Sequence, residues 1–195
     1  LEDWSRSQGS AERNADARMI LALGLGAGLR ASEIANSTGT DVVEDGDAVL
    51  VLPHGYRGAG RRRSVVTHSF EDDVRNRVAQ VGREGFLFKP DSRNRATSII
   101  STFIKRSLAN GRLRPDTRRL RSTWIVDHLY GGVPQSVICD MAGLADLQHY
   151  SHWVQQAGAL HAPEYVEQAR RVGRRHGLSL TGEVVSLEDY RRARP

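Results

Sequence analysis

The sequence predicts a mainly α-helical domain with a small antiparallel β-sheet. Between residues 11 and 24, Ala15, Met19 and Leu23 recur at the spacing of one helix face. The pattern changes after a short helix near residues 31–37. There Asp45-Gly46-Asp47 predicts a turn, and the segments 48–52 and 64–67 are rich in the β-branched and apolar residues of strands. Helical patterns then return, so we expect the sheet to be an insertion in a helical protein.

The later elements follow from their start and stop signals. Ser69 with Asp72 three residues on predicts a capped helix over 69–81, and 85–88 predicts a short strand. Helices are then predicted over 96–108, 117–130, 134–143, 147–156 and 163–176. We expect one domain over 1–176 and a polar, arginine-rich tail over 177–195. Because the chain opens at Leu1, we also expect it to be part of a longer protein.

The charge favours nucleic acid as a partner. The formal net charge is +5, and 26 of the 28 basic Lys and Arg residues are arginine, since Lys89 and Lys105 are the two lysines. A planar guanidinium group binds phosphate oxygens in pairs. The single cysteine, Cys139, excludes an intramolecular disulfide. A single cysteine also fits a reducing cytoplasm, and no apolar run is long enough to span a membrane. With the basic charge, we expect a cytoplasmic, nucleoid-associated protein with no membrane partner.

Four segments carry a resemblance to a known family. Residues 28–34 read Gly-Leu-Arg-Ala-Ser-Glu-Ile, and residues 118–124 read Arg-Arg-Leu-Arg-Ser-Thr-Trp. Residues 86–106 join a Phe-Leu-Phe segment to a helix, and residues 131–153 run from Gly-Gly-Val to a final tryptophan. In this order and spacing, the segments resemble the catalytic domain of tyrosine recombinases (phage integrases). The resemblance covers roughly residues 12–156 and implies the same mainly α fold.

The resemblance implies a reaction on DNA. In that family a tyrosine hydroxyl attacks a phosphodiester and forms a covalent phosphotyrosine. Two arginines stabilise the negative charge of the transition state, while a lysine on the hairpin and a histidine transfer protons. A further histidine or tryptophan donates a hydrogen bond to the phosphate. No metal or nucleotide cofactor is implied.

Carried onto this chain, the family pattern is retained only in part. Arg30 and Arg121 match the two arginines, but Arg118 stands at the first histidine position. Leu144 stands at the second histidine position, and Trp153 stands at the nucleophile position nine residues later. The hairpin lysine has no counterpart, and its neighbourhood holds Arg57, Arg61, Arg62 and Arg63. Indole has no hydroxyl, and guanidinium is a poor general acid.

These departures predict a protein that binds double-stranded DNA but is catalytically impaired. We expect Arg30 and Arg121 to hold a phosphate, with the hairpin arginines, His149 and His152 as further DNA contacts. The protein is expected to act beside an active recombinase or as an oligomer with itself. The alternative role for Arg30 and Arg121 is structural, because arginines near a core often hold carboxylates.

Two other interpretations remain open. Tyr150 lies about one helical turn before Trp153, roughly 4.5 Å along a helix axis, and is the candidate for a displaced nucleophile in an active recombinase. Residues 132–154 also fit a helix-turn-helix with Ala142-Gly143 near the turn, which favours a transcription factor. The spacing of His149 and His152 suits a metal, but the sequence offers no third ligand.

Overall fold

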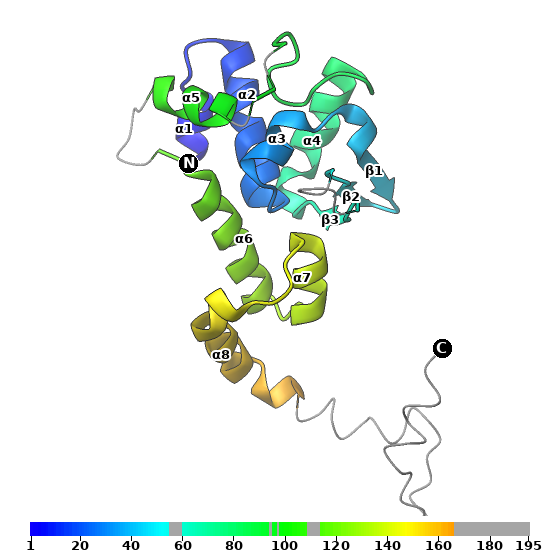
Figure 1. Ribbon diagram of the computed structural model, residues 1–195, viewed down its shortest axis with the longest axis vertical. Helices are drawn as coiled ribbons and strands as arrows, with labels where there is room; N and C mark the ends of the chain where they lie inside the picture. Colours follow the sequence, from blue (N-terminus) through cyan, green and yellow to red (C-terminus); the bar gives the residue numbers. More distant parts are fainter. Residues whose placement is uncertain (55–59, 94, 97, 109–113, 166–195) are drawn as a thin grey trace, which may run out of the picture. The chain divides into compact units, whose positions relative to one another are not determined.

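The structure is a computed structural model that describes residues 1–54, 60–93, 95–96, 98–108 and 114–165. These residues form α-helices and one small sheet, which lies to one side next to α4 (Figure 1). The helices are α1 (Glu2–Arg6), α2 (Ala11–Leu21), α3 (Ala31–Asn36), α4 (His68–Val81), α5 (Ser98–Arg106), α6 (Thr117–Tyr130), α7 (Gln135–Ala142) and α8 (Ser151–Leu160). The described residues also form a π-helical segment (Ala22–Gly26) and two 3-10 turns (Gly39–Asp41 and Gln148–Tyr150). The predicted fold class, mainly α with a small antiparallel sheet, is confirmed.

The chain divides into two compact units, Leu1–Val154 and Gln155–Pro195. The first unit holds the core, the sheet and helices α1 to α7. In the second unit, residues 155–165 are described. The predicted domain boundary at residue 176 and most of the predicted helix over 163–176 lie outside the described residues.

The core of the first unit is built around α2 and the π-helical segment that continues it. Ile20, Leu21 and Leu23 are fully or almost fully buried there, and the segment contacts both α4 and α6. The sequence predicted this helix between residues 11 and 24, but the helical path continues to Gly26. Gly26 lies against the Phe70 ring of α4, where a Cβ atom would come within 2.8 Å of a ring carbon. The glycines therefore allow close helix packing as well as the turn that follows.

The sheet is three-stranded and antiparallel, in the order β1 (Val42–Asp45), β2 (Ala48–Val51) and β3 (Ser64–Val65). Asp45 pairs with Ala48 across the predicted two-residue turn, where Gly46 has φ of +62° as such turns require. Val51 pairs with Ser64, and β2 lies against α4 (Figure 1). The sheet and α4 together fix the position of the segment 60–63 that leads into β3.

Two local predictions were wrong in detail. Helix α4 begins at His68 after Thr67, and no side-chain hydrogen bond caps it, so the Ser69 capping box does not form. The predicted strand over 85–88 makes only one isolated bridge, between Phe86 and Thr38, because its backbone pairs with the loop after α3 instead of with the sheet. By contrast, α6 begins at Thr117 as predicted, with the Asp116 carboxylate accepting two backbone N–H groups.

Candidate functional site

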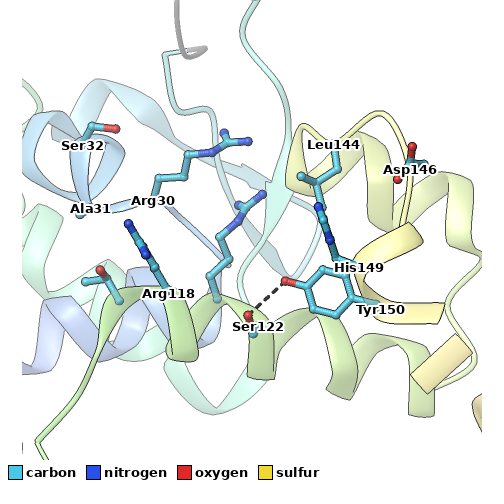
Figure 2. Close-up of a pocket in the computed structure, with 11 residues that line it drawn as sticks. Arg30, Ala31, Ser32, Arg118, Ser122, Leu144, Asp146, His149 and Tyr150 are labelled. Carbon is cyan, nitrogen blue, oxygen red and sulfur yellow. Dashed lines mark hydrogen bonds between the residues drawn. The ribbon is translucent and has the colours of Figure 1, made fainter. Parts of the chain in front are cut away.

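A pocket of about 930 Å³ opens between the start of α3, the first half of α6 and the segment after α7 (Figure 2). Most of the residues carried over from the family pattern meet there. The pocket is lined by Arg30, Ala31, Ser32, Thr117, Arg118, Arg121, Ser122, Leu144, Asp146, His149 and Tyr150. Three guanidinium groups from two distant parts of the sequence therefore face one space.

Arg30 is placed by the turn that precedes α3. Gly28 adopts φ of +62° and packs against the Trp124 ring, where a Cβ atom would lie only 2.5 Å from a ring carbon. The Glu33 carboxylate accepts the Arg30 backbone N–H at 2.7 Å and its Nη1 at 3.0 Å. Arg30 Nη2 donates to the Gly143 carbonyl at 2.9 Å. The start of α3 thus holds Arg30 at the mouth of the pocket.

Arg121 comes from α6, on the buried face that also carries Trp124. Its two Nη atoms donate to the carbonyls of Gly28 and Ala142. Burial first, and then the nearby positive charges of Arg30 and Arg62, lower the pKa of Arg121 to about 10. The protein therefore holds this cation in surroundings that disfavour its charge, and a bound anion would relieve that cost.

Glu33 lies beneath the pocket and binds a second arginine, Arg62. Arg62 donates to both carboxylate oxygens of Glu33, with Nη2 at 2.8 Å from Oε2. The side chains of Glu33 and Arg62 are 2% and 9% exposed. Burial alone would raise the pKa of Glu33, but the hydrogen bonds and charges of Arg62 and Arg30 outweigh burial, so its pKa is lowered. Glu33 is therefore an ionised carboxylate shared by two guanidinium groups.

The charge around the pocket does not balance. Among the described residues, Arg30, Arg62, Arg118 and Arg121 are accompanied there by two carboxylates, Glu33 and Asp146. Arg118 is exposed, and its guanidinium group makes no hydrogen bond or ion pair with any described residue. Of the five N–H donors of a guanidinium group, Arg30 and Arg121 each use two in the bonds above. The pocket thus combines excess positive charge with N–H donors still available to an anion.

Tyr150 enters the pocket from the 3-10 turn before α8. Its hydroxyl lies 3.1 Å from the Ser122 hydroxyl, on the α6 turn next to Arg121 (Figure 2). Leu144 and His149 also line the pocket, so an apolar side chain occupies the second histidine position. The sequence motifs did not single out Ser122 as a site residue, although it directly follows Arg121.

Trp153 lies away from the pocket. The residue is 40% exposed, and its ring packs edge-on against the rings of Tyr130 and His152, with centroid distances of 6.3 and 5.4 Å. His152 does not line the pocket either. The structure therefore brings the alternative residue Tyr150 to the arginines and leaves the nucleophile position predicted from spacing outside.

The predicted hairpin arginines have different environments. Arg61 binds the buried Asp41 carboxylate at 3.0 Å, Arg63 binds Asp45 at 2.8 Å, and neither lines the pocket. Arg62 lies behind the pocket in contact with Glu33. Arg57 lies outside the described residues. As placed here, the three described arginines serve carboxylates of their own chain.

Within the part of the chain that the structure describes, no cluster of three His, Cys, Asp or Glu side chains is arranged to hold a metal ion. None of the helices in that part has the length and apolar character needed to cross a bilayer.

Comparison with known proteins identifies the fold. No protein-family model and no curated protein matches the sequence. Among solved structures, the chain is similar to the Tn1549 transposon integrase in complex with transposon right end DNA, with 15% identity and a TM-score of 0.57 over 78% of this chain and 58% of that one. It is similar to XerA recombinase, with 18% identity and a TM-score of 0.58 over 87% and 64%. For the XerH site-specific recombinase bound to palindromic difH substrate, identity is 14% and the TM-score 0.54 over 89% and 49%.

These likenesses show that the chain has the fold of recombinase and integrase catalytic domains, as the sequence predicted. The chain spans less than two thirds of the length of each of the three.

Proposed function

We propose that this chain is a tyrosine-recombinase-type domain that binds double-stranded DNA by holding a backbone phosphate in the arginine-lined pocket, without cleaving the strand. The convergence of Arg30, Arg118 and Arg121 on one space with excess positive charge supports this most directly. Phosphate contacts from arginine dominate the affinity of DNA-binding proteins. The similar folds of two structures that contain DNA are consistent with the proposal.

Three features support the absence of cleavage. Arg118 stands where the family has a proton-transferring histidine, and its guanidinium group is a poor general acid. Trp153 has no hydroxyl and is exposed outside the pocket. The hairpin lysine of the family has no counterpart, and Arg62 in its neighbourhood is a poor general acid that is engaged with Glu33. The domain therefore retains groups that hold a phosphate and lacks those that move protons.

A second candidate function is strand transfer with Tyr150 as nucleophile. Its hydroxyl lies in the pocket beside Arg121 and Ser122, which is the observation that favours it. In this reaction the Tyr150 oxygen would bond to phosphorus as the bond to the 5′ oxygen breaks. A base would take the Tyr150 hydroxyl proton and an acid would deliver a proton to the released 5′ oxygen, so that the net transfer is from Tyr150 to that oxygen. His149 is the titratable pocket residue nearest in sequence to Tyr150.

The helix-turn-helix interpretation would account for DNA binding through α7 and α8 alone. It assigns no role to Arg30, which lies far upstream of that segment in the sequence. It therefore predicts that Arg30→Ala leaves DNA affinity unchanged.

As a DNA-binding domain, the protein would work on the chromosome, beside an active recombinase or as its own oligomer.

Arg118 provides the cleanest test of phosphate binding. Its guanidinium group has no partner among the described residues, so Arg118→Ala should leave the fold intact. We expect about tenfold weaker binding, or about 1.4 kcal/mol, to a short labelled duplex by fluorescence anisotropy. Arg119→Ala is the matched control, because Arg119 is also exposed, with no side-chain partner among the described residues, but does not line the pocket. Equal effects of the two variants would contradict a phosphate site in this pocket.

A further inference from the structure

Three consecutive carbonyl groups at the end of α7 are each bound by an arginine from a different part of the chain. The Met141 carbonyl accepts Arg62 Nε at 2.6 Å, and the Ala142 carbonyl accepts Arg121 Nη2. The Gly143 carbonyl accepts Arg30 Nη2 at 2.9 Å. Arg30 and Arg121 line the pocket, and Arg62 does not. The two arginines proposed to bind phosphate therefore also bind the end of α7.

The local geometry at the end of α7 explains why these carbonyls are free. Gly143 takes the left-handed conformation with φ of +62° and donates its N–H to the Asp140 carbonyl. The Leu144 N–H donates to the Cys139 carbonyl, which completes the usual glycine-ended helix terminus. The carbonyls of Met141, Ala142 and Gly143 have no intrahelical partner and lie at the negative end of the helix dipole. Guanidinium groups satisfy both the hydrogen bonds and the charge.

Arg62 connects this helix end to the rest of the site. Its Nη atoms hold the Glu33 carboxylate, which in turn holds Arg30, while its Nε holds Met141. Arg62 also packs against Gly143, where a Cβ atom would come within 3.1 Å of its Cδ. Arg62 does not line the pocket, so it has no place at the phosphate itself.

We propose that Arg62 is a positioning residue of the DNA-phosphate site. It acts through Glu33 and the end of α7 to keep the Arg30 and Arg121 guanidinium groups converged on the pocket. This inference rests on the proposed function. Because the segment after α7 carries Leu144, His149 and Tyr150 into the pocket, Arg62 also sets the position of that wall.

Glu33→Gln separates positioning from simple charge. If the pocket acted only through its total charge, removal of the Glu33 carboxylate would strengthen DNA binding. If Glu33 and Arg62 position the arginines, the same change should weaken binding about fivefold, because a neutral amide holds two guanidinium groups poorly. Glutamine has the shape of glutamate, so this variant also serves if Arg62→Ala fails to fold.

The salt dependence of binding provides the second measurement. Log affinity decreases linearly with log salt, and this dependence becomes less steep by about 0.9 for each DNA phosphate that the protein no longer neutralises. We expect Arg62→Ala to lower the slope by the equivalent of about two phosphates, since Arg30 and Arg121 disengage with it. Arg63→Ala, the matched control with an exposed ion pair to Asp45, should lower it by the equivalent of about one phosphate or less. Arg62→Lys should behave like Arg62→Ala, because one ammonium group cannot bind both carboxylate oxygens of Glu33 and the Met141 carbonyl at the same time.

Amide hydrogen exchange tests the inference without DNA. Arg62→Ala and Glu33→Gln should speed exchange at residues 141–144 while leaving α4 (His68–Val81) unchanged. Unchanged exchange at 141–144 would overturn the inference, as would tighter DNA binding by Glu33→Gln or full recovery by Arg62→Lys. Absence of salt-sensitive DNA binding by the unaltered protein would instead refute the proposed function, and the exchange result would still decide whether Arg62 holds the helix end.

Discussion

The Tyr150 hydroxyl lies 3.1 Å from the Ser122 hydroxyl inside the arginine-lined pocket, whereas Trp153 does not line the pocket. Ser122 directly follows Arg121 on α6, so this contact joins the segment after α7 to the helix that carries a phosphate-binding arginine. The contact explains the presence of Tyr150 in the pocket by packing and hydrogen bonding alone. We therefore expect Tyr150 to support the pocket wall without reacting.

Tyr150→Phe tests that structural role. Removing one part-buried hydrogen bond should lower the free energy of unfolding by about 1 kcal/mol, measured by urea denaturation. DNA affinity should stay within about twofold of the unaltered protein, since the arginines are unchanged. Tyr165→Phe, at an exposed tyrosine outside the pocket, is the control. A loss of affinity above about tenfold would mean that the hydroxyl contacts DNA.

The Glu33 carboxylate should make stability depend on pH in the acid range. Its pKa in the folded protein is lower than the ordinary value of 4.5, so the unfolded chain binds more protons as pH falls. The stabilisation is therefore fully present above pH 4.5 and is lost as pH falls through the lower, folded-state pKa. Glu33→Gln should cost about 3 kcal/mol at neutral pH, because it breaks a buried ion pair.

The same variant should flatten the acid side of the stability curve. Urea denaturation between neutral and acid pH measures the difference between the two proteins. A wild-type curve that falls no more steeply than the Glu33→Gln curve would show that Glu33 is not held as a carboxylate.

Gly28→Ala should destabilise the turn that positions Arg30. The alanine must adopt φ of +62°, and its Cβ would lie 2.5 Å from a Trp124 ring carbon. We expect a loss of about 3 kcal/mol, the sum of an unfavourable backbone conformation and an overpacked core. Gly60→Ala is the control, because nothing lies within 4 Å of its Cβ and its φ is not positive, so its effect should stay within about 0.5 kcal/mol. Equal thermal denaturation midpoints for the two variants would contradict the packing described.

Leu144→His should strengthen phosphate binding, because it adds a hydrogen-bond donor to the pocket wall. We expect about threefold tighter DNA binding at about pH 8 and about tenfold at about pH 6, where an imidazole with the ordinary pKa near 6.5 is mostly charged. Ala145→His adds the same group to an exposed position that does not line the pocket. If both variants gained affinity equally, the effect would come from charge at the surface and not from the pocket.

The sequence predicted those parts of the fold that depend on local signals. The Gly46 turn, the start of α6 after Asp116 and the end of α7 at Gly143 each follow from a residue whose backbone or side-chain chemistry acts within a few positions. The π-helical continuation to Gly26 was not predicted, because it depends on the approach of Phe70 from α4. The strand predicted at 85–88 likewise depended on its partner, which is the loop after α3.

The sequence predicted which arginines belong to the candidate site, but it did not predict the contacts that hold them there. Motif spacing found Arg30, Arg118 and Arg121, and the structure brings all three to one pocket. Spacing could not show that Arg62 turns inward to Glu33, because ion pairs between distant segments are set by tertiary packing. Spacing also assigned Trp153 to the nucleophile position, with Tyr150 as the alternative, and of these two residues Tyr150 lines the pocket.

The most direct test of the central claim is to trap a covalent intermediate. The protein would be incubated with nicked duplex DNA, on which a cleaved strand diffuses away and leaves any phosphotyrosine bond in place. The samples would then be denatured in SDS and analysed by gel and mass spectrometry. We predict DNA that is retained in a salt-sensitive complex before denaturation and no protein–DNA adduct afterwards. An adduct mapped to Tyr150 and absent from Tyr150→Phe would contradict the account and identify the protein as an active strand transferase.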